Sequence, residues 1–375
     1  MRIIFAGGGT AGHINPALAI AGYVRERQPD ADILYIGAKG GMEERLVPQA
    51  GFEFKGITVQ GFKRRVSFKA LKENVVTVKK AISASTAAKK IIQEFKPDIC
   101  VGTGGYVSGP VLRAAAKLGI PTIIHEQNAY PGITNKMLSK KAARVMLAMP
   151  AAREHFKGKC NFVDTGNPVR GDILKQERNE ARMQLGLDER PVILSFGGSL
   201  GARKINESLA DIIARSAQDG RYQHIHAYGQ YGKWFPKLLE DKGADLEKAK
   251  NLDIREYIND MPVCLAAADV VIARAGAITL SEIQVMGKPS ILIPSPNVAE
   301  NHQYHNAMSL VEKNAAVMIE EKDLTPEKLT EEIDKLAADP ERLVQYSENA
   351  KAMAISDSSK RIYSIIIEVI ATSGK

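Results

Sequence analysis

The chain has 375 residues, of which 45% are hydrophobic and 25% charged, and a formal net charge of +8. These values are typical of a globular protein long enough for two domains. No apolar run approaches the ~20 residues of a membrane-spanning helix, and the apolar N-terminal stretch is too short for a signal peptide, so a cytoplasmic protein is expected. The positive charge predicts an anionic partner: nucleic acid, a phosphorylated ligand or an anionic membrane surface. The three cysteines form no C-x-x-C motif, and neither a disulfide framework nor a zinc site is expected.

The first thirteen residues combine a short apolar run, a glycine turn and a histidine. Four glycines between positions 7 and 12 precede His13. Glycines permit positive φ and a close approach of the backbone, and a helix expected to begin near Pro16 points free amides at the turn. An anion or an oxygen-rich substrate is the expected ligand. Histidine side chains exchange protons near neutral pH, so His13 is a candidate general base.

The glycine spacing also fits the G-x-G-x-x-G fingerprint of dinucleotide-binding folds. That fingerprint needs an acidic residue about 20 positions on, at the end of the second strand, to hold the ribose. Asp30 and Asp32 lie near that distance, but they precede the apolar run 33–36 instead of following it. An NADP oxidoreductase that uses Lys39 is therefore the weaker alternative. The other alternative is a glycine turn that only joins a strand to a helix.

Residues 61–96 form a basic segment in which aromatic residues precede helix-prone sequence. At an anionic membrane surface each nearby cation contributes about 1 kcal/mol, and apolar side chains enter the interface. Single-stranded nucleic acid is the competing partner, and a solvated helix face is the structural alternative. The residues chosen for membrane contact are Phe62, Lys63, Arg64, Arg65 and Phe68.

Two further strands of the first half are expected to end in glycine-rich or polar sequence. A strand over 97–101 leads into a second glycine turn and a helix from about Pro110, and a strand over 121–125 ends at a polar Glu-Gln-Asn triplet. Because the carboxyl ends of parallel strands meet at one edge of a sheet, these tips are expected to share a ligand site. The structural alternative is that His125 and Glu126 only cap the sheet edge. The expected members of the site are His13, Thr103, Tyr106, Glu126 and Asn128.

A second α/β series begins after a boundary near residue 166. A strand over 191–196 leads through a glycine turn over 197–202 into a helix from about Lys204. Alternation of strands and helices predicts a parallel sheet covered on both faces. The expected fold is α/β, with two Rossmann-like doubly wound domains over 1–166 and 167–352 and an apolar helix at about 353–375 that packs back on the first. The further strands expected in the second series are 224–228, 252–256, 270–273 and 290–293.

The segment 273–282 predicts a strand end, a turn of small residues and the first turn of a helix. The free amides of such a helix start can hold a phosphate. Glu282 is placed to accept two vicinal hydroxyls, as on a ribose, although a first-turn glutamate favoured by the helix dipole is the alternative. His302 and His305 have metal-ligand spacing but no third ligand nearby, so no metal site is expected.

Seven short motifs make the chain resemble the MurG family over essentially its whole length. They are Gly-Gly-Thr-Ala-Gly-His13, Gly-Thr-Gly-Gly-Tyr106, His-Glu-Gln-Asn128, Gly-Asn-Pro-Val-Arg170, Gly-Gly-Ser-Leu-Gly201, Arg-Ala-Gly-Ala-Ile-Thr-Leu-Ser-Glu282 and Asn-His-Gln303. Members of this family are N-acetylglucosaminyltransferases of peptidoglycan synthesis, which convert lipid I to lipid II with UDP-N-acetylglucosamine on a GT-B scaffold of two Rossmann-like domains and a cleft. The resemblance implies the same activity, without a cofactor, a metal or nucleic acid, in a peripheral protein at the cytoplasmic face of the cell membrane.

The resemblance also implies a chemical role for individual residues. His13 would deprotonate the 4-hydroxyl of the acceptor for an inverting attack on the anomeric carbon, and Glu126 is the next candidate for this role. An epimerase, or a transferase with another acceptor, is the alternative on the same fold. Ala11 and His302 depart from the commonest family pattern. The residues implied on the acceptor side are Gly9, His13, Gly104 and Tyr106.

The second domain would hold the uridine diphosphate. The resemblance places Arg170 and Ser199 near the nucleotide and phosphates, Ile258 beside the uracil, and Glu282 on the ribose. The backbone amides of Ile278 and Thr279 would face the donor, and Asn128 and Gln303 would hold the sugar. The residues implied for donor binding are Thr10, Gly12, Asn128, Arg170, Ser199, Ile258, Ile278, Thr279, Glu282 and Gln303.

Overall fold

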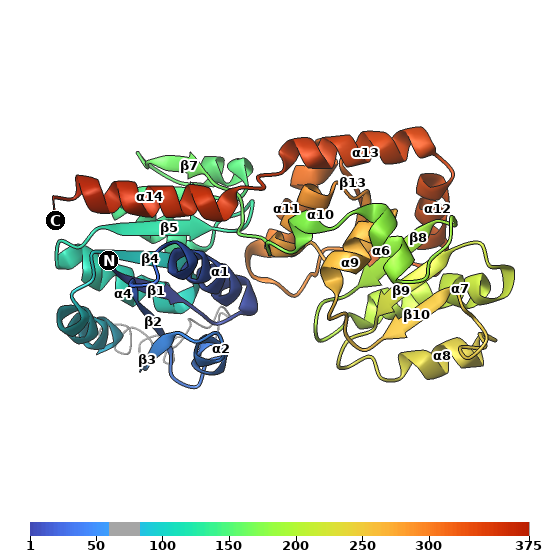
Figure 1. Ribbon diagram of the computed structural model, residues 1–375, viewed down its shortest axis with the longest axis horizontal. Helices are drawn as coiled ribbons and strands as arrows, with labels where there is room; N and C mark the ends of the chain where they lie inside the picture. Colours follow the sequence, from blue (N-terminus) through green and yellow to red (C-terminus); the bar gives the residue numbers. More distant parts are fainter. Residues whose placement is uncertain (60–82, 375) are drawn as a thin grey trace. The chain divides into compact units, whose positions relative to one another are not determined.

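The structure is a computed structural model that describes residues 1–59 and 83–374 (Figure 1). Contacts divide the chain into two compact units, one of Met1–Pro168 with Asp357–Lys375 and one of Val169–Ser356. Each unit has one sheet in which all paired strands are parallel. The predicted fold class, α/β with two doubly wound parallel sheets, is confirmed. Among the described helices, none combines the length and the apolar character needed to cross a bilayer.

Within the described residues, the sheet of the first unit has seven strands in the order β3-β2-β1-β4-β5-β6-β7. The strands are β1 (Arg2–Gly7), β2 (Asp32–Ala38), β3 (Glu53–Ile57), β4 (Ile99–Gly104), β5 (Thr122–Glu126), β6 (Arg144–Leu147) and β7 (Phe162–Asp164). The helices are α1 (Ala11–Arg27), α2 (Glu43–Gln49), residues 83–95, α4 (Gly105–Lys117), α5 (Ile133–Leu138) and α14 (Ser358–Thr372), with short 3-10 turns η1 (Ser139–Lys141) and η2 (Pro150–His155).

Helices cover both faces of this sheet because its central strands are apolar on both sides. Successive side chains of a strand point to opposite faces. Accordingly Ile4 belongs to a core cluster shared with α4, whereas Ile3 and Phe5 belong to the cluster shared with α1 and α14. Strands buried on both faces have continuous apolar sequence, as β1 has.

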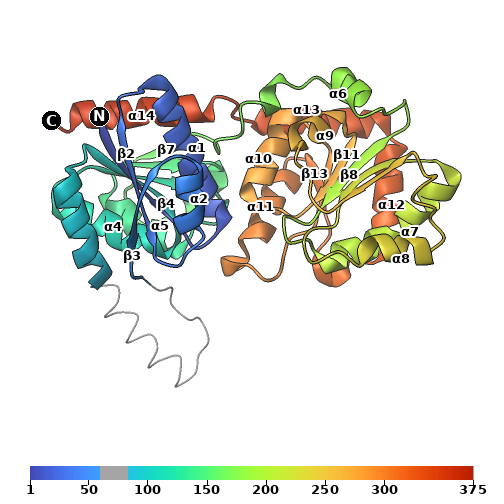
Figure 2. The same cartoon turned by 60° about the horizontal axis from the view of Figure 1, so that its bottom comes forward.

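The C-terminal helix α14 belongs to the first unit, where Figures 1 and 2 show it beside α1. Ile362 and Ile366 are fully buried in the cluster that contains α1. The rings of Tyr23 and Tyr363 meet edge to face at 5.9 Å. The last turns of the chain therefore complete the core of the first unit.

The second unit repeats the strand order of the first, as β10-β9-β8-β11-β12-β13. The strands are β8 (Val192–Phe196), β9 (Gln223–Ala227), β10 (Leu252–Arg255), β11 (Val270–Ala273), β12 (Ser290–Leu292) and β13 (Ala316–Met318). The helices are α6 (Arg178–Gln184), α7 (Arg203–Asp219), α8 (Phe235–Asp241), α9 (Met261–Ala267), α10 (Ala277–Met286), α11 (His302–Val311), α12 (Pro326–Ala337) and α13 (Pro340–Met353), with 3-10 turns η3 (Ile173–Lys175), η4 (Ala299–Asn301) and η5 (Glu321–Asp323).

The strands predicted from the apolar runs are all present, but two helix starts were predicted wrongly. Helix α1 begins at Ala11 and α4 at Gly105, so that Pro16 and Pro110 lie inside the helices. Proline is favoured in the first turn because it has no amide to donate there. That preference misplaced both starts, because the small residues ahead of each proline give no signal for a helix start.

Candidate active site

In each unit the strand order reverses beside the central strand, between β1 and β4 and between β8 and β11. Ligands of open α/β sheets bind at the carboxyl ends of strands at such a switch point. The glycine turns that follow these four strands carry most of the candidate residues.

Four acceptor-side candidates of the first unit lie together. A Cβ on Gly9, which has φ +86°, would lie 2.7 Å from the ring of Tyr106. A Cβ on Gly104, which has φ +102°, would lie 2.9 Å from Nδ1 of His13. Glycine is therefore required at both positions, because two side chains pack directly against the backbone there.

His13 is the third residue of α1 and its ring is half-buried. The hydroxyl of Thr103 donates a hydrogen bond of 2.7 Å to the His13 carbonyl oxygen, which fixes the start of α1 against β4. Nδ1 of His13 lies 3.2 Å from Oε1 of Gln127. Among the described residues Nε2 of His13 has no hydrogen-bond partner. One ring nitrogen is thus held by the protein, and the other is available to a substrate.

Hydrogen-bond donors surround the carboxylate of Glu126, whereas a general base must be open to its substrate. Its carboxylate accepts the amide N–H groups of Asn128 and Gly132 at 3.1 Å, and the side-chain amides of Asn128 and Asn135 at 3.2 and 2.8 Å. A carboxylate offers about four lone-pair sites, so these four bonds occupy it. The geometry favours the alternative that Glu126 holds the loop after β5, and weighs against its candidacy as a base.

Glu43 is a buried acid of this region that the sequence did not reveal. It is fully buried at the start of α2, accepts the Ala38 N–H at 2.9 Å and faces the Gly9 N–H at 3.5 Å. A Cβ on Gly8 would lie 2.1 Å from its carboxylate oxygen. Burial, followed by the charge of Glu43, raises the pKa of Tyr106. A negative charge beneath the first turn favours an oxygen-rich ligand there over an anion.

The structure places Asp32 where it cannot hold the ribose of a dinucleotide. Asp32 is the first residue of β2, at the amino end of the strand, and it pairs with Arg2 at 3.0 Å. An acid that binds a ribose must follow the carboxyl end of that strand.

In the second unit, three residues separate the end of β11 from the start of helix α10. Gly276 is the N-cap residue and contributes no side-chain hydrogen bond, and the first turn contains no acid. The backbone N–H groups of Ile278 and Thr279 have no partner among the described residues. Free amides at a helix start attract anions such as phosphate.

Glu282 lies one turn further along α10 and is half-buried. Within the described parts of the chain its carboxylate accepts no hydrogen bond. Burial raises its pKa from 4.5 to about 7, and the nearby charge of Arg170 opposes this effect. Arg170 itself is exposed and donates to Asp172 through Nε at 3.2 Å and Nη2 at 2.6 Å. An acid that is withdrawn from water and has no donor is suited to receive hydroxyl groups from a ligand.

Three other donor candidates also follow strands of this sheet. Ser199 is exposed in the turn after β8, which is so tight that a Cβ on Gly201 would lie 2.2 Å from the Tyr228 carbonyl oxygen. Ile258 follows β10 and is 3% exposed. Gln303, at the start of α11, accepts the Ser295 N–H at 2.9 Å.

The remaining donor candidates are in the first unit, and the membrane candidates are outside the described residues. Thr10 and Gly12 are exposed at the start of α1, and Asn128 is half-buried beside Glu126. All five residues predicted for membrane contact lie outside the described residues: Phe62, Lys63, Arg64, Arg65 and Phe68.

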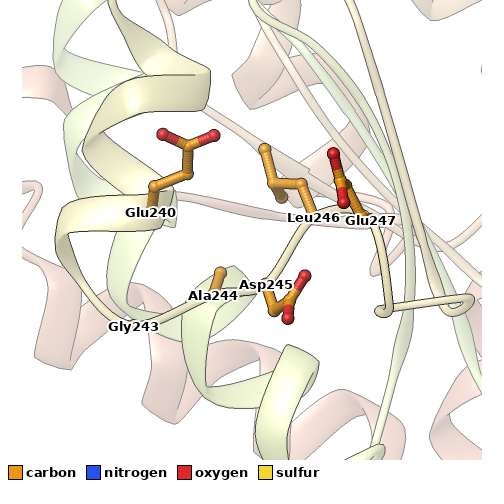
Figure 3. Close-up of a pocket in the computed structure, with 6 residues that line it drawn as sticks. All are labelled: Glu240, Gly243, Ala244, Asp245, Leu246 and Glu247. Atoms are coloured by element: carbon orange, nitrogen blue, oxygen red, sulfur yellow. The ribbon is translucent and has the colours of Figure 1, made fainter.

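A surface hollow of about 410 Å³ in the second unit lies elsewhere (Figure 3). Its lining begins on α8 and continues along the loop toward β10, and it includes Glu240, Asp245 and Glu247. This loop leads to the amino end of a strand, whereas the candidate residues follow carboxyl ends. Three carboxylates also oppose a phosphorylated ligand.

Comparisons with known proteins agree with this arrangement. Residues 3–147 match the glycosyltransferase family 28 N-terminal domain, and residues 192–362 match the family 28 C-terminal domain. A curated relative from Acetivibrio thermocellus, the UDP-N-acetylglucosamine–N-acetylmuramyl-(pentapeptide) pyrophosphoryl-undecaprenol N-acetylglucosamine transferase, is 48% identical over 99% of this chain and 98% of its own. The relative of the same name from Bacillus cytotoxicus is 42% identical over 99% of this chain and 100% of its own.

Solved structures show the same relationship. The crystal structure of MurG from Acinetobacter baumannii has a TM-score of 0.79 at 30% identity, and the match covers 98% of this chain and 99% of that one. A UDP-GlcNAc 2-epimerase from Neisseria meningitidis has a TM-score of 0.64 at 14% identity, over 98% of this chain and 100% of that one, which shows a shared fold alone. By sequence and by structure, the chain belongs to the MurG family of family 28 glycosyltransferases.

Proposed function

We propose that this protein transfers N-acetylglucosamine from UDP-N-acetylglucosamine to the 4-hydroxyl of the N-acetylmuramyl sugar in undecaprenyl-pyrophosphoryl-MurNAc-pentapeptide. This is the step from lipid I to lipid II in peptidoglycan synthesis. The names of relatives that are 48% and 42% identical over nearly the whole chain support it. The structural observation that carries it is the start of α10, where the amides of Ile278 and Thr279 precede the half-buried carboxylate of Glu282, and neither these amides nor the carboxylate has a hydrogen-bond partner among the described residues.

The chemistry of a nucleoside diphosphate matches this helix start. The diphosphate would accept the N–H groups of Ile278 and Thr279 and lie near the cation of Arg170. The two ribose hydroxyls would donate to Glu282 and supply the donors that its carboxylate lacks. The other residues proposed for the donor are Ser199, Ile258 and Gln303 from the second unit, and Thr10, Gly12 and Asn128 from the first.

His13 is the proposed general base. Its Nε2, which has no hydrogen-bond partner in the described part of the chain, would take the proton of the acceptor hydroxyl, which attacks the anomeric carbon with inversion while UDP departs. The leaving diphosphate gains negative charge, and fixed amide dipoles with Arg170 would stabilise it electrostatically. The packed Gly9, Gly104 and Tyr106 would form the acceptor side of this site. We propose that Glu126 positions the loop of Asn128.

The lipid tail of the acceptor requires that the protein reach a membrane. We propose a peripheral location at the anionic cytoplasmic face, supported by the net charge of +8 and by the basic, aromatic sequence near residue 65. Nucleic acid is not a proposed partner.

The transfer of labelled sugar from UDP-N-acetylglucosamine to lipid I tests this function. The wild type should form labelled lipid II. Glu282→Ala should raise the KM for the donor about 10- to 150-fold, because hydrogen bonds to a charged group contribute about 1.5–3 kcal/mol. Glu312→Gln, at an exposed position after α11, is the matched control and should behave as the wild type. Absence of transfer to lipid I, or an unchanged donor KM in Glu282→Ala, would refute the proposal.

A further inference from the structure

We propose that His125 and Gln127 are positioning residues that fix the tautomer of His13, so that its proton sits on Nδ1 and its Nε2 accepts the proton of the substrate. The inference rests on the proposed role of His13 as the general base. It concerns a chain of side chains that lies entirely in the first unit.

The chain of contacts runs from the core of the sheet to His13. Nε2 of His125 lies 2.9 Å from the carbonyl oxygen of Gly166. Nε2 of Gln127 lies 3.0 Å from Nδ1 of His125, and Oε1 of Gln127 lies 3.2 Å from Nδ1 of His13. His125 is 0% exposed and Gln127 is 1% exposed, so water does not compete for the two contacts of His125.

The direction of each hydrogen bond follows from chemistry. A carbonyl oxygen only accepts, so His125 must donate its Nε2–H to Gly166. Burial lowers the pKa of His125, which keeps the ring neutral, and its Nδ1 is therefore an acceptor. The amide nitrogen of Gln127 donates to that Nδ1 and, at 2.9 Å, to the His125 carbonyl oxygen.

This arrangement leaves only the amide oxygen of Gln127 to face His13. Because this oxygen cannot donate, Nδ1 of His13 must carry a hydrogen, and the lone pair of the neutral ring is on Nε2. A histidine side chain free in water prefers the opposite tautomer, with its hydrogen on Nε2. In that tautomer Nε2 has no lone pair in the ring plane and cannot accept a proton. The neutral amide suits both states of the reaction, since a protonated His13 still donates from Nδ1.

The ring of His13 is also held in place by the backbone around it. It packs against Gly104, where a Cβ would lie 2.9 Å from Nδ1, and its carbonyl oxygen is fixed by Thr103. The side-chain amide of Asn167 donates to the Gln127 carbonyl oxygen at 3.3 Å, which anchors the middle of the chain. Position and tautomer of the base are thus set by the same buried strand end.

Nitrogen NMR of the full-length protein with ¹⁵N-labelled histidine rings tests the inference directly. His13→Ala identifies the His13 signals. In the wild type at a pH where His13 is neutral, Nε2 should give the signal of an unprotonated nitrogen and Nδ1 that of a protonated one. In Gln127→Leu the Nε2–H tautomer should appear, and kcat should fall about 2- to 12-fold with the donor KM unchanged, as expected for one hydrogen bond.

Two further variants separate positioning from folding. His125→Asn retains an acceptor close to the place of Nδ1 and should keep more of the wild-type kcat than His125→Leu. Gln223→Leu removes a glutamine of the second unit that is 2% exposed, and should leave the His13 signals unchanged.

A wild-type spectrum with the hydrogen of His13 on Nε2 would overturn the inference, and so would an unchanged tautomer in Gln127→Leu. Wild-type turnover in His13→Ala would instead overturn the base role that we propose. The spectrum and the turnover of His13→Ala therefore report separately on the tautomer and on the base.

Discussion

Glu282 should lower the stability of the unliganded protein at neutral and alkaline pH, although it contributes to donor binding. Burial raises its pKa from 4.5 to about 7 in the folded, unliganded protein. Each pKa unit corresponds to about 1.4 kcal/mol, so the ionised carboxylate disfavours folding by up to about 3 kcal/mol. The substitution Glu282→Gln keeps the shape of the side chain and removes the charge.

The sign of the pH dependence follows from the raised pKa. The folded state holds the proton of Glu282 more tightly than the unfolded state does, so this contribution to stability is complete below pH 4.5. It is lost as the pH rises to about 7. The difference in unfolding free energy between Glu282→Gln and the wild type should therefore be small at pH 4.5 and grow to as much as about 3 kcal/mol above pH 7.

Urea unfolding at a series of pH values, followed for both proteins without ligand, measures this difference. Glu312→Gln is the control for a general effect of lost surface charge. Donor titrations on the same samples should show wild-type affinity falling below pH 7, and a weaker affinity in Glu282→Gln that does not vary with pH in this range. A stability difference that stays flat across this range would refute the burial argument, and donor affinity equal to wild type would refute the ribose contact.

Three other predictions test separate parts of the molecule. His13→Ala should lower kcat by about 10²–10⁴ and leave donor affinity unchanged, and kcat against pH should lose its acidic limb; a folded variant with near wild-type turnover would contradict the base role. Asp269→Ala should lower the free energy of unfolding, measured by urea titration, by about 3 kcal/mol. The substitution removes the carboxylate that pairs with Arg182, whose side chain is only 7% exposed. An unchanged urea midpoint of unfolding would contradict this prediction. The third change replaces two aromatic residues by Ser and three cations by Gln, at Phe62, Phe68, Lys63, Arg64 and Arg65. This variant should bind vesicles less and turn over the full-length lipid more slowly, but keep its activity on a short-chain soluble acceptor. Equal loss of activity on both acceptors would indicate that the segment is structural.

The sequence alone determined the fold class and the strand ends at which to look for the site. Apolar runs at regular spacing predicted the central strands, because strands buried on both faces must be apolar throughout. Glycine turns after β1, β4 and β8 were visible because positive φ and close packing restrict those positions to glycine. Strands β3, β6, β7 and β13 were not predicted, since β3 and β7 are partly exposed and β6 and β13 have only four and three residues.

Tertiary structure decided which polar residues are available for chemistry. Glu126 and Glu282 are both acids near the ends of strands or the starts of helices, and sequence treats them alike. Only the fold surrounds the first with four donors and leaves the second with none from residues 1–59 and 83–374. Likewise the burial of Glu43, and the contact from His125 through Gln127 to His13, join residues far apart in the chain. Hydrogen-bond partners and burial depend on long-range packing, which local patterns of residues do not specify.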